Sequence, residues 1–280
     1  MKRKLFCELS PTTYRLSVAK NRAQRRLKDR LSGAVFAQKK GQPLPVTVYR
    51  HASLIRRTLG SVDPRLQENK AVNLAIAAPK VSHILIRPGE TFSFWRLVGE
   101  PTAKKGYREG LVLKGGETDS GIGGGMCQFS NLIHWMVLHS ELEIIEHHHH
   151  DGYDLFPDFG RQVPFGTGTS VFYNYLDYRF YNGTDRTYQL LIAVTDTHLK
   201  GELRCSAPQA YSYHIGAEGE KFVREDGVVY RVGEVYRTKV EKKTGAAVEK
   251  ALLRKNHARV MYDTAGLEIE ENEQDTGGYF

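Results

Sequence analysis

The chain has few cysteines and no long apolar run. Cys7, Cys127 and Cys205 are its three cysteines in 280 residues, too few and too widely spaced for a disulfide framework, which favours a reducing compartment. No window approaches the roughly 18 uninterrupted apolar residues of a membrane span. Residues 1–20 also lack the apolar segment of a secretory signal. We therefore expect a cytoplasmic chain, with peripheral contact to a membrane left open.

Acidic residues are scarce in the first 60 residues, where fifteen Lys and Arg stand against Glu8 and Asp29. This segment has a net charge of +13, so the other 220 residues sum to −5 within the total of +8. Residues 14–38 repeat leucine and alanine at helical spacing between basic side chains, which predicts a basic amphipathic helix. Either this helix packs on the protein with a solvated basic face, or it contacts an anionic surface such as membrane phosphates. Nucleic acid is disfavoured, because no recognition module or aromatic interleaving accompanies the charge.

Hydrophobic periodicity predicts an α+β fold. With 40% hydrophobic and 26% charged residues, the composition is that of a globular protein. We expect a helix that carries Cys127 to pack on an antiparallel sheet, after a basic helical N-terminal region and before a small β meander. The predicted helices are 66–78 and 127–139, and the predicted core strands are 81–86, 142–150, 169–181 and 187–195. The predicted divisions are a basic region at 1–62, a core at 63–205, a β meander at 206–264 and a disordered acidic tail at 265–280.

A glycine-rich loop delivers Cys127 to the start of the second helix. The unpaired N–H groups of a helix N-terminus stabilise a thiolate or an oxyanion, so this position favours a reactive thiol. About twenty residues later comes a block of four histidines, in which strand alternation would place His148 and His150 on one face. A cysteine on a helix followed by a histidine on a strand is the order of papain-like and transglutaminase-like enzymes. Asp177, Asp154 and Asp151 are candidates for the carboxylate that orients the imidazole.

Three interpretations of these residues remain open. In the first, Cys127 is a nucleophile and His148 or His150 is its base. In the second, the two histidines and Cys127 or Asp177 bind zinc, since these are ordinary zinc ligands. In the third, Cys127 is an inert buried thiol and the histidines lie on a surface loop, because free cysteine is among the most buried residue types.

Several separated sequence blocks together resemble the VanW family over roughly residues 65–195. The blocks are Pro88–Val98, Gly106–Leu111, Gly123–Asn131, Glu146–His150 and Asp177–Asn182. The family pattern, carried over position by position, singles out Gly124, Gly125, Cys127, Gln128, Ser130, His148, His150, Asp177 and Asn182. One departure is Gly168, which stands where the family usually has an acid.

The resemblance implies a cell-wall setting linked to glycopeptide resistance. The function we expect is thiol-dependent acyl transfer or amide hydrolysis on a peptidoglycan precursor or another peptide-like substrate. In that scheme Cys127 attacks, His148 or His150 acts as base and Asp177 orients the base. Gln128 and the helix N–H groups would hold the oxyanion, with Gly124, Gly125, Ser130 and Asn182 near the substrate and no cofactor. The alternatives are non-enzymatic binding of a peptidoglycan-like or anionic ligand and a zinc site built on Cys127, His148 and His150.

Overall fold

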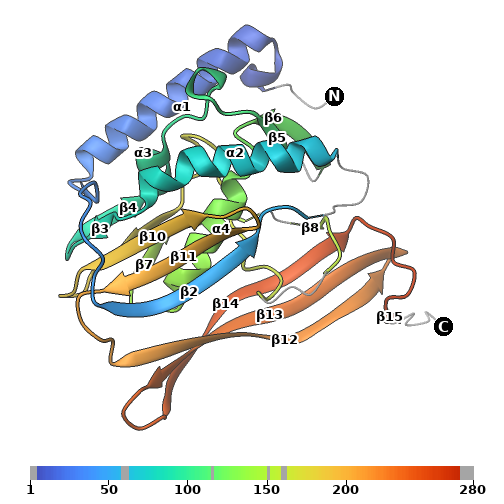
Figure 1. Cartoon of the computed structure of the whole chain (residues 1–280). Coiled ribbons are helices and arrows are strands. Elements are labelled where there is room, and N and C mark those ends of the chain that lie inside the picture. Colours follow the sequence, from blue (N-terminus) through green and yellow to red (C-terminus); the bar gives the residue numbers. More distant parts are fainter. Residues whose placement is uncertain (1–4, 58–62, 115–116, 150–151, 159–162, 272–280) are drawn as a thin grey trace.

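Two four-stranded sheets form the core of the computed structural model, which describes residues 5–57, 63–114, 117–149, 152–158 and 163–271. Figure 1 shows helices packed around them. The first sheet is antiparallel and has the order β2 (Val46–Leu54), β11 (His198–Cys205), β10 (Tyr188–Val194) and β3 (Leu85–Ile86). The second has the order β1 (Val35–Phe36), β4 (Glu90–Ser93), β9 (Arg179–Tyr181) and β7 (Glu143–Glu146). In this sheet β1 is parallel to β4 and the other pairs are antiparallel.

The helix that carries Cys127, α4 (Met126–Leu138), lies against β2 and β11 of the first sheet. Its apolar residues at helical spacing, among them Phe129, Leu132 and Met136, are buried, which explains why this segment folds as a packed helix. Gly201 on β11 permits the close approach, because a Cβ there would lie 2.6 Å from Met136 Cε.

The remaining elements of the core surround the glycine loop. They are α2 (Pro64–Val81), the short helix α3 (Phe94–Val98), the 3₁₀ turn η2 (Ala103–Lys105) and the hairpin of β5 (Glu109–Lys114) and β6 (Glu117–Ile122). The hairpin ends directly before the loop that enters α4. The helices predicted at 66–78 and 127–139 are therefore confirmed as α2 and α4, and the α+β class is confirmed with them.

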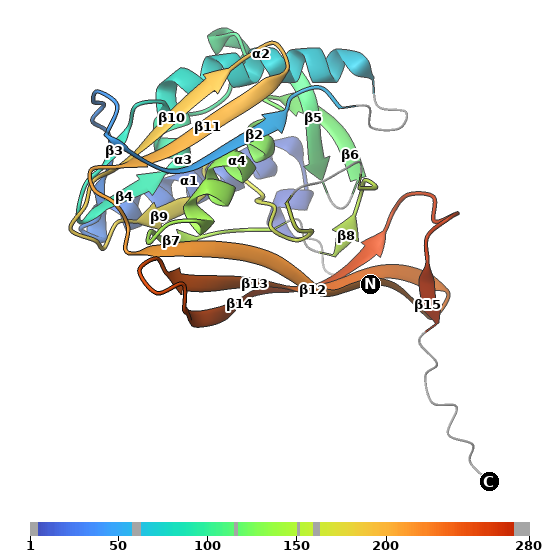
Figure 2. The same ribbon diagram turned by 60° about the horizontal axis from the view of Figure 1, so that its bottom comes forward.

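Three long strands form a meander below the core, as Figure 2 shows. They are β12 (Tyr211–Glu225), β13 (Val228–Glu241) and β14 (Ala247–Val260). The sheet also includes β8 (Tyr153–Asp154), which pairs with β14, and β15 (Ile269–Glu271), which pairs with β12. Because β15 belongs to a sheet, the prediction of a disordered tail is wrong for its first part, and residues 272–280 lie outside the described part.

Three predicted strands are shorter than expected. The segment predicted at 81–86 is a strand only as β3, because α2 continues to Val81. The segment predicted at 142–150 is a strand only as β7 (Glu143–Glu146), and the segment at 169–181 only as β9. In the last segment, residues 169–178 bond to side chains, to the histidine segment and within a turn at residues 172–176. Ser170 N donates to His148 O at 2.7 Å, and Thr169 N donates to Asn131 Oδ1 at 2.6 Å.

The N-terminal helix α1 (Pro11–Leu31) follows a 3₁₀ turn, η1 (Phe6–Glu8), and packs on the core through charged side chains. It ends earlier than the predicted residue 38, since Gly33 adopts a left-handed φ of 67° and the chain continues into β1. Arg25 binds Glu146, and both carboxylate oxygens of Asp29 accept hydrogen bonds from Arg179 at 2.6 and 2.9 Å. The leucines of the predicted stripe face outward instead: Leu16, Leu27 and Leu31 are 57%, 57% and 75% exposed. Within the described residues, none of the helices has the length and apolar character needed to cross a bilayer.

Candidate functional site

The glycine loop before α4 is held in place by Asn73 of α2. The Asn73 amide donates to Arg108 O and to Gly124 O, each at 2.9 Å, and its Oδ1 accepts from Arg108 N at 2.8 Å. Gly124 packs so closely on the backbone of Gly110 that no Cβ fits between them. Gly125 has a φ of 106°, which favours glycine. These contacts fix the place where the first turn of α4 begins.

The face of α2 toward this loop presents a buried cation. The Lys70 stem runs past Gly125, where an added Cβ would lie 2.6 Å from Lys70 Cγ, and Lys70 is 8% exposed. Burial, with the charges of Arg57 and Arg56, lowers the pKa of Lys70 to about 8, so its ammonium group is still charged at neutral pH. Across the described part of the chain, no carboxylate forms an ion pair with Lys70.

Two further features beside Lys70 lack hydrogen-bond partners. Gln67 lies one turn earlier on α2, and both polar atoms of its amide are buried without a partner within the described ranges. The α4 N-terminus at Gly125 has no side-chain cap, which leaves first-turn N–H groups without a side-chain acceptor. A cation with no carboxylate partner in the described ranges, an amide without a partner there and a helix N-terminus together favour an anion. Lys70 stands between Leu66 and Leu74 at helical spacing, and a lysine in line with apolar residues is the sequence signal for this site that the sequence reasoning missed.

Cys127 lies in the first turn of α4, and its side chain is half-buried. Its Sγ is 3.9 Å from Val171 O, and burial raises the pKa of the Cys127 thiol, opposite to the expected activation. Ser130 is fully buried, with its Oγ donating to Cys127 O at 3.1 Å and contacting Thr169 Oγ1. The segment at residues 169–171 therefore covers the first turn of α4.

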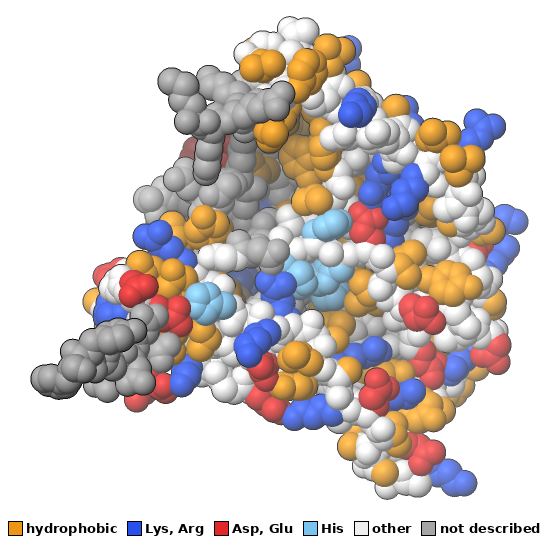
Figure 3. All heavy atoms as spheres, turned by 180° about the vertical axis from the view of Figure 1, so that it is seen from behind, with side chains coloured by type: hydrophobic (Ala, Val, Ile, Leu, Met, Phe, Trp, Pro, Cys, Tyr) orange, Lys and Arg blue, Asp and Glu red, His pale blue; other side chains and the backbone are white. Residues whose placement is uncertain are grey.

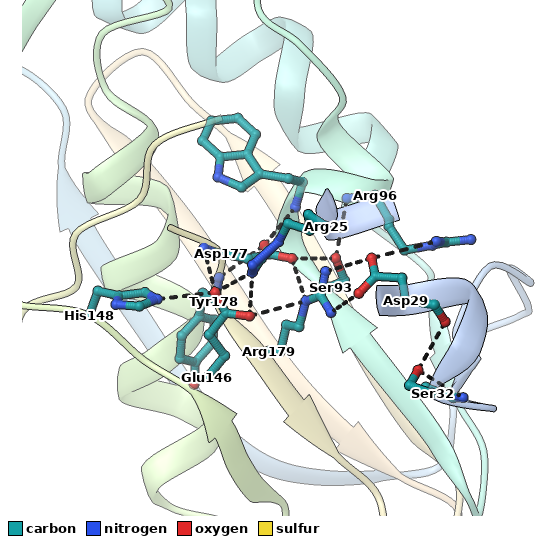
Figure 4. A network of polar contacts seen from close by, with 12 residues as sticks. Arg25, Asp29, Ser32, Ser93, Arg96, Glu146, His148, Asp177, Tyr178 and Arg179 are labelled. Atoms are coloured by element: carbon teal, nitrogen blue, oxygen red, sulfur yellow. Dashed lines mark hydrogen bonds and ion pairs between the residues drawn. The ribbon is translucent and has the colours of Figure 1, made fainter. Parts of the chain in front are cut away.

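Three of the predicted polar residues bond to protein groups in the structure. Gln128 Nε2 donates to Ser53 Oγ and to Leu54 O, both at 2.8 Å. Asn182 is buried and donates to the carbonyls of Ile86 and Arg186 at 2.9 and 2.7 Å. Asp177 is buried in a network drawn in Figure 4, in which it accepts from Ser93 Oγ, Trp95 N and Arg179 Nε. Each of these contacts stabilises the fold around the loop.

The carboxylate that contacts His148 is Glu146, as Figure 4 shows. Its Oε1 lies 3.0 Å from His148 Nε2 and accepts from Asp177 N at 2.9 Å, and the same carboxylate binds Arg25 of α1. Burial alone would raise the pKa of Glu146, but the hydrogen bonds from Arg25 and His148 keep that pKa below its usual value. Sequence reasoning proposed Asp177 for this role and missed Glu146, although Glu146 directly precedes the histidine block.

Two other histidines of the block, His147 and His149, pack with a buried histidine of α4, His134. The rings of His134 and His147 are 4.1 Å apart, those of His147 and His149 are 4.0 Å apart, and His134 Nδ1 lies 3.1 Å from Tyr178 Oη. Burial and the neighbouring His149 lower the pKa of His147 to about 3. Figure 3 shows histidine side chains gathered near the middle of one face. The described residues contain no group of three or more His, Cys, Asp and Glu side chains placed to hold a metal ion; His150 lies outside them, so the zinc interpretation stays a prediction.

One short backbone segment, residues 170–171, contacts both Cys127 and His148. Val171 O contacts Cys127 Sγ, while Ser170 N donates to His148 O at 2.7 Å. No direct contact joins the two side chains in the part of the chain that the structure describes. Approach of the thiol to the imidazole would require Ser170 and Val171 to move.

Comparison with known proteins identifies the family. The family model described as VanW like protein matches residues 69–204. The vancomycin B-type resistance protein VanW of Enterococcus faecalis is 32% identical over 247 residues, which cover 88% of this chain and 90% of that protein. The uncharacterized protein YoaR of Bacillus subtilis is 30% identical over 118 residues, 41% of this chain and 36% of that protein. The chain therefore belongs to the VanW family. No solved structure matches it.

Proposed function

We propose that this chain acts in vancomycin resistance by binding an anionic, peptide-like cell-wall precursor at the N-terminus of α4. The role in resistance is supported by the similarity to the Enterococcus faecalis protein over nearly the whole of both chains. The binding mode rests on the buried charge of Lys70 beside an uncapped helix N-terminus. The proposed place of action is the cytoplasm, where such precursors are made.

A carboxylate or phosphate would satisfy the groups that the fold leaves without partners. A nearly buried lysine with no carboxylate partner in the part of the chain that the structure describes is unfavourable, and an anion that reaches Lys70 offsets that cost. Helix N–H groups and the neighbouring Arg56 and Arg57 add attraction of the same sign. Peptide precursors of the cell wall carry both carboxylates and phosphates. The amide of Gln67 can both donate and accept, which suits a peptide group next to the anion.

A second candidate is thiol-dependent acyl transfer or amide hydrolysis, favoured by the Glu146–His148 pair and by the place of Cys127 next to the proposed anion site. In this reaction the Cys127 sulfur attacks a carbonyl carbon after His148 accepts the thiol proton. The C–N bond breaks, a thioester forms and the amine leaves with that proton. The reaction requires displacement of the segment at residues 169–171, whereas binding at Lys70 does not.

Calorimetry with UDP-N-acetylmuramoyl-pentapeptide tests the binding. We expect Lys70→Met to weaken binding by about tenfold or more, since a charge-assisted contact is lost. The affinity of the unaltered chain should fall as the pH rises through about 8, the pKa of Lys70, and this fall should be absent in Lys70→Met. Lys243→Met, which removes an exposed lysine of the meander, is the matched control. Equal affinity of Lys70→Met and the unaltered chain would exclude the site.

A resistance assay separates the two candidates. The chain is expressed in a host that carries a B-type resistance cluster without its own VanW protein, and the inhibitory concentration of vancomycin is measured. Binding alone predicts that Cys127→Ser supports resistance as well as the unaltered chain, while Lys70→Met does not. If Cys127→Ser binds the precursor normally but loses resistance, the thiol reaction is the function.

A further inference from the structure

The outer face of α1 is apolar, although the inner face holds the helix to the protein. Leu27 follows Arg25 by two positions, which turns it by about 200° on the helix and away from the core. Leu16, Leu27 and Leu31 are more than half exposed, and Ala19 and Ala23 between them are also exposed. The view in Figure 1 agrees, since α1 lies along the outside of the molecule with one side free of other elements.

Positive side chains lie both within and beside this apolar face. The exposed ones on α1 are Arg15, Lys20, Arg26, Lys28 and Arg30. None of them forms an ion pair within the described ranges. Asp29, the helix's one acidic residue, faces inward and is bound to Arg179. The outer face therefore combines apolar and positive groups without any negative group.

We propose that the outer face of α1 docks on a bilayer of anionic phospholipids. The helix would lie in the plane of the interface, with its leucines at the boundary of the acyl chains and its lysines and arginines at the phosphates. The long basic side chains can extend sideways from the apolar stripe to reach the headgroups. A second copy of the chain is a poorer occupant, because two such faces would bring their positive flanks together. This inference is independent of the proposed precursor site.

The ion pairs on the inner face keep the rest of the protein attached to α1 when the helix binds the bilayer. Arg22 binds Glu100 at 2.8 Å, Arg25 binds Glu146 and Asp29 binds Arg179, so three contacts along the helix connect it to the core. None of them involves a residue of the apolar face. Substitutions of the leucines therefore leave the attachment of α1 intact.

Flotation with vesicles tests the proposal, using the full chain and vesicles of phosphatidylcholine alone or with phosphatidylglycerol. We expect binding to the mixed vesicles only, and weaker binding as salt increases. Leu16→Ser combined with Leu27→Ser should lower partitioning by about tenfold, because two apolar anchors are lost. Leu252→Ser, at a leucine of the meander that is 52% exposed, is the matched control and should bind normally.

Three outcomes would overturn the proposal. The first is no binding of the unaltered chain to either vesicle. The second is undiminished binding of the double leucine variant when circular dichroism shows it folded. The third is equal binding to a soluble polyphosphate that the leucine changes do not affect, which would identify a charged polymer instead of a lipid surface. The oligomeric state is measured by light scattering. A dimer of the unaltered chain that dissociates when the leucines are changed would also overturn the proposal and would show that this face mediates self-association.

Discussion

Among single residues, His147 illustrates how burial changes chemistry that composition suggests. One interpretation of the sequence places the histidines on a surface loop, yet the ring of His147 packs between His134 and His149 and its Nε2 lies 3.2 Å from Gly168 O. The pKa of about 3 keeps His147 neutral at physiological pH.

This lowered pKa predicts acid sensitivity. An unfolded histidine has a pKa of about 6.5, so the unfolded chain binds more protons than the folded one between that pH and about 3. The contribution of His147 to the free energy of unfolding is fully present above about pH 6.5 and is lost as the pH falls from there to about 3. We expect His147→Asn to reduce the fall in melting temperature between pH 6.5 and 4, measured by calorimetry. His214→Asn, at an exposed histidine of the meander, should leave the pH dependence unchanged; an unaltered slope for His147→Asn would contradict the assignment.

Single residues also set the limit of prediction for the site. The sequence predicts that Cys127 begins a helix, and the structure agrees. Its reactivity could not be predicted, because the group that contacts the thiol is Val171 O, 44 positions away. The same is true of Asp177, whose partners Ser93 and Trp95 are more than 80 positions away. Periodicity reports local spacing and contains no information on such distant contacts.

At the scale of elements, α1 shows that a pattern can predict a helix without indicating which face is buried. Leucines at helical spacing normally mark the packed side, but here the packed side is that of Arg25 and Asp29. The deciding partners, Glu146 and Arg179, come more than 100 residues later. The long strands of the meander were easier to predict, since neighbouring strands pair through short turns.

We expect the attachment of α1 to the core to depend most on Asp29. Asp29→Asn leaves the guanidinium of Arg179, 12% exposed, without one of its charged partners. We expect a loss of about 1–3 kcal/mol in the free energy of unfolding, measured by urea denaturation, and faster tryptic cleavage within α1. Arg26→Ala changes an exposed side chain of the same helix and should alter stability by less than about 0.5 kcal/mol. If Asp29→Asn behaves like this control, the ion pair does not hold the helix.

At the scale of the whole molecule, the meander and the core are joined by shared secondary structure and by buried charge. β8 comes from the loop after the histidine block but belongs to the meander sheet. Arg231 of β13, 4% exposed, contacts Asp154 of β8, and it also binds Asp158 and Glu220. Arg237 donates to Ser140 O just after α4. These contacts predict that the two parts unfold together.

Arg231→Met tests this joint unfolding. The substitution leaves the carboxylate of Asp154, 2% exposed, without its arginine, and breaking a buried pair in this way typically costs about 3–5 kcal/mol. We expect calorimetry to show one transition for the unaltered chain and a lower melting temperature or two transitions for the variant. Lys242→Met, at an exposed lysine of the same sheet region, is the control. Two separate transitions in the unaltered chain would show that the meander unfolds independently.

The Glu146 carboxylate has a thermodynamic consequence for the whole molecule. It accepts hydrogen bonds from both Arg25 of α1 and His148. The same carboxylate therefore attaches the N-terminal helix and orients the imidazole. Linkage is reciprocal: if binding of Arg25 changes the affinity of Glu146 for His148 by some factor, binding of His148 changes its affinity for Arg25 by the same factor. A ligand that takes His148 away from Glu146 therefore alters how firmly α1 is attached, and detachment of α1 alters how firmly Glu146 holds the His148 imidazole.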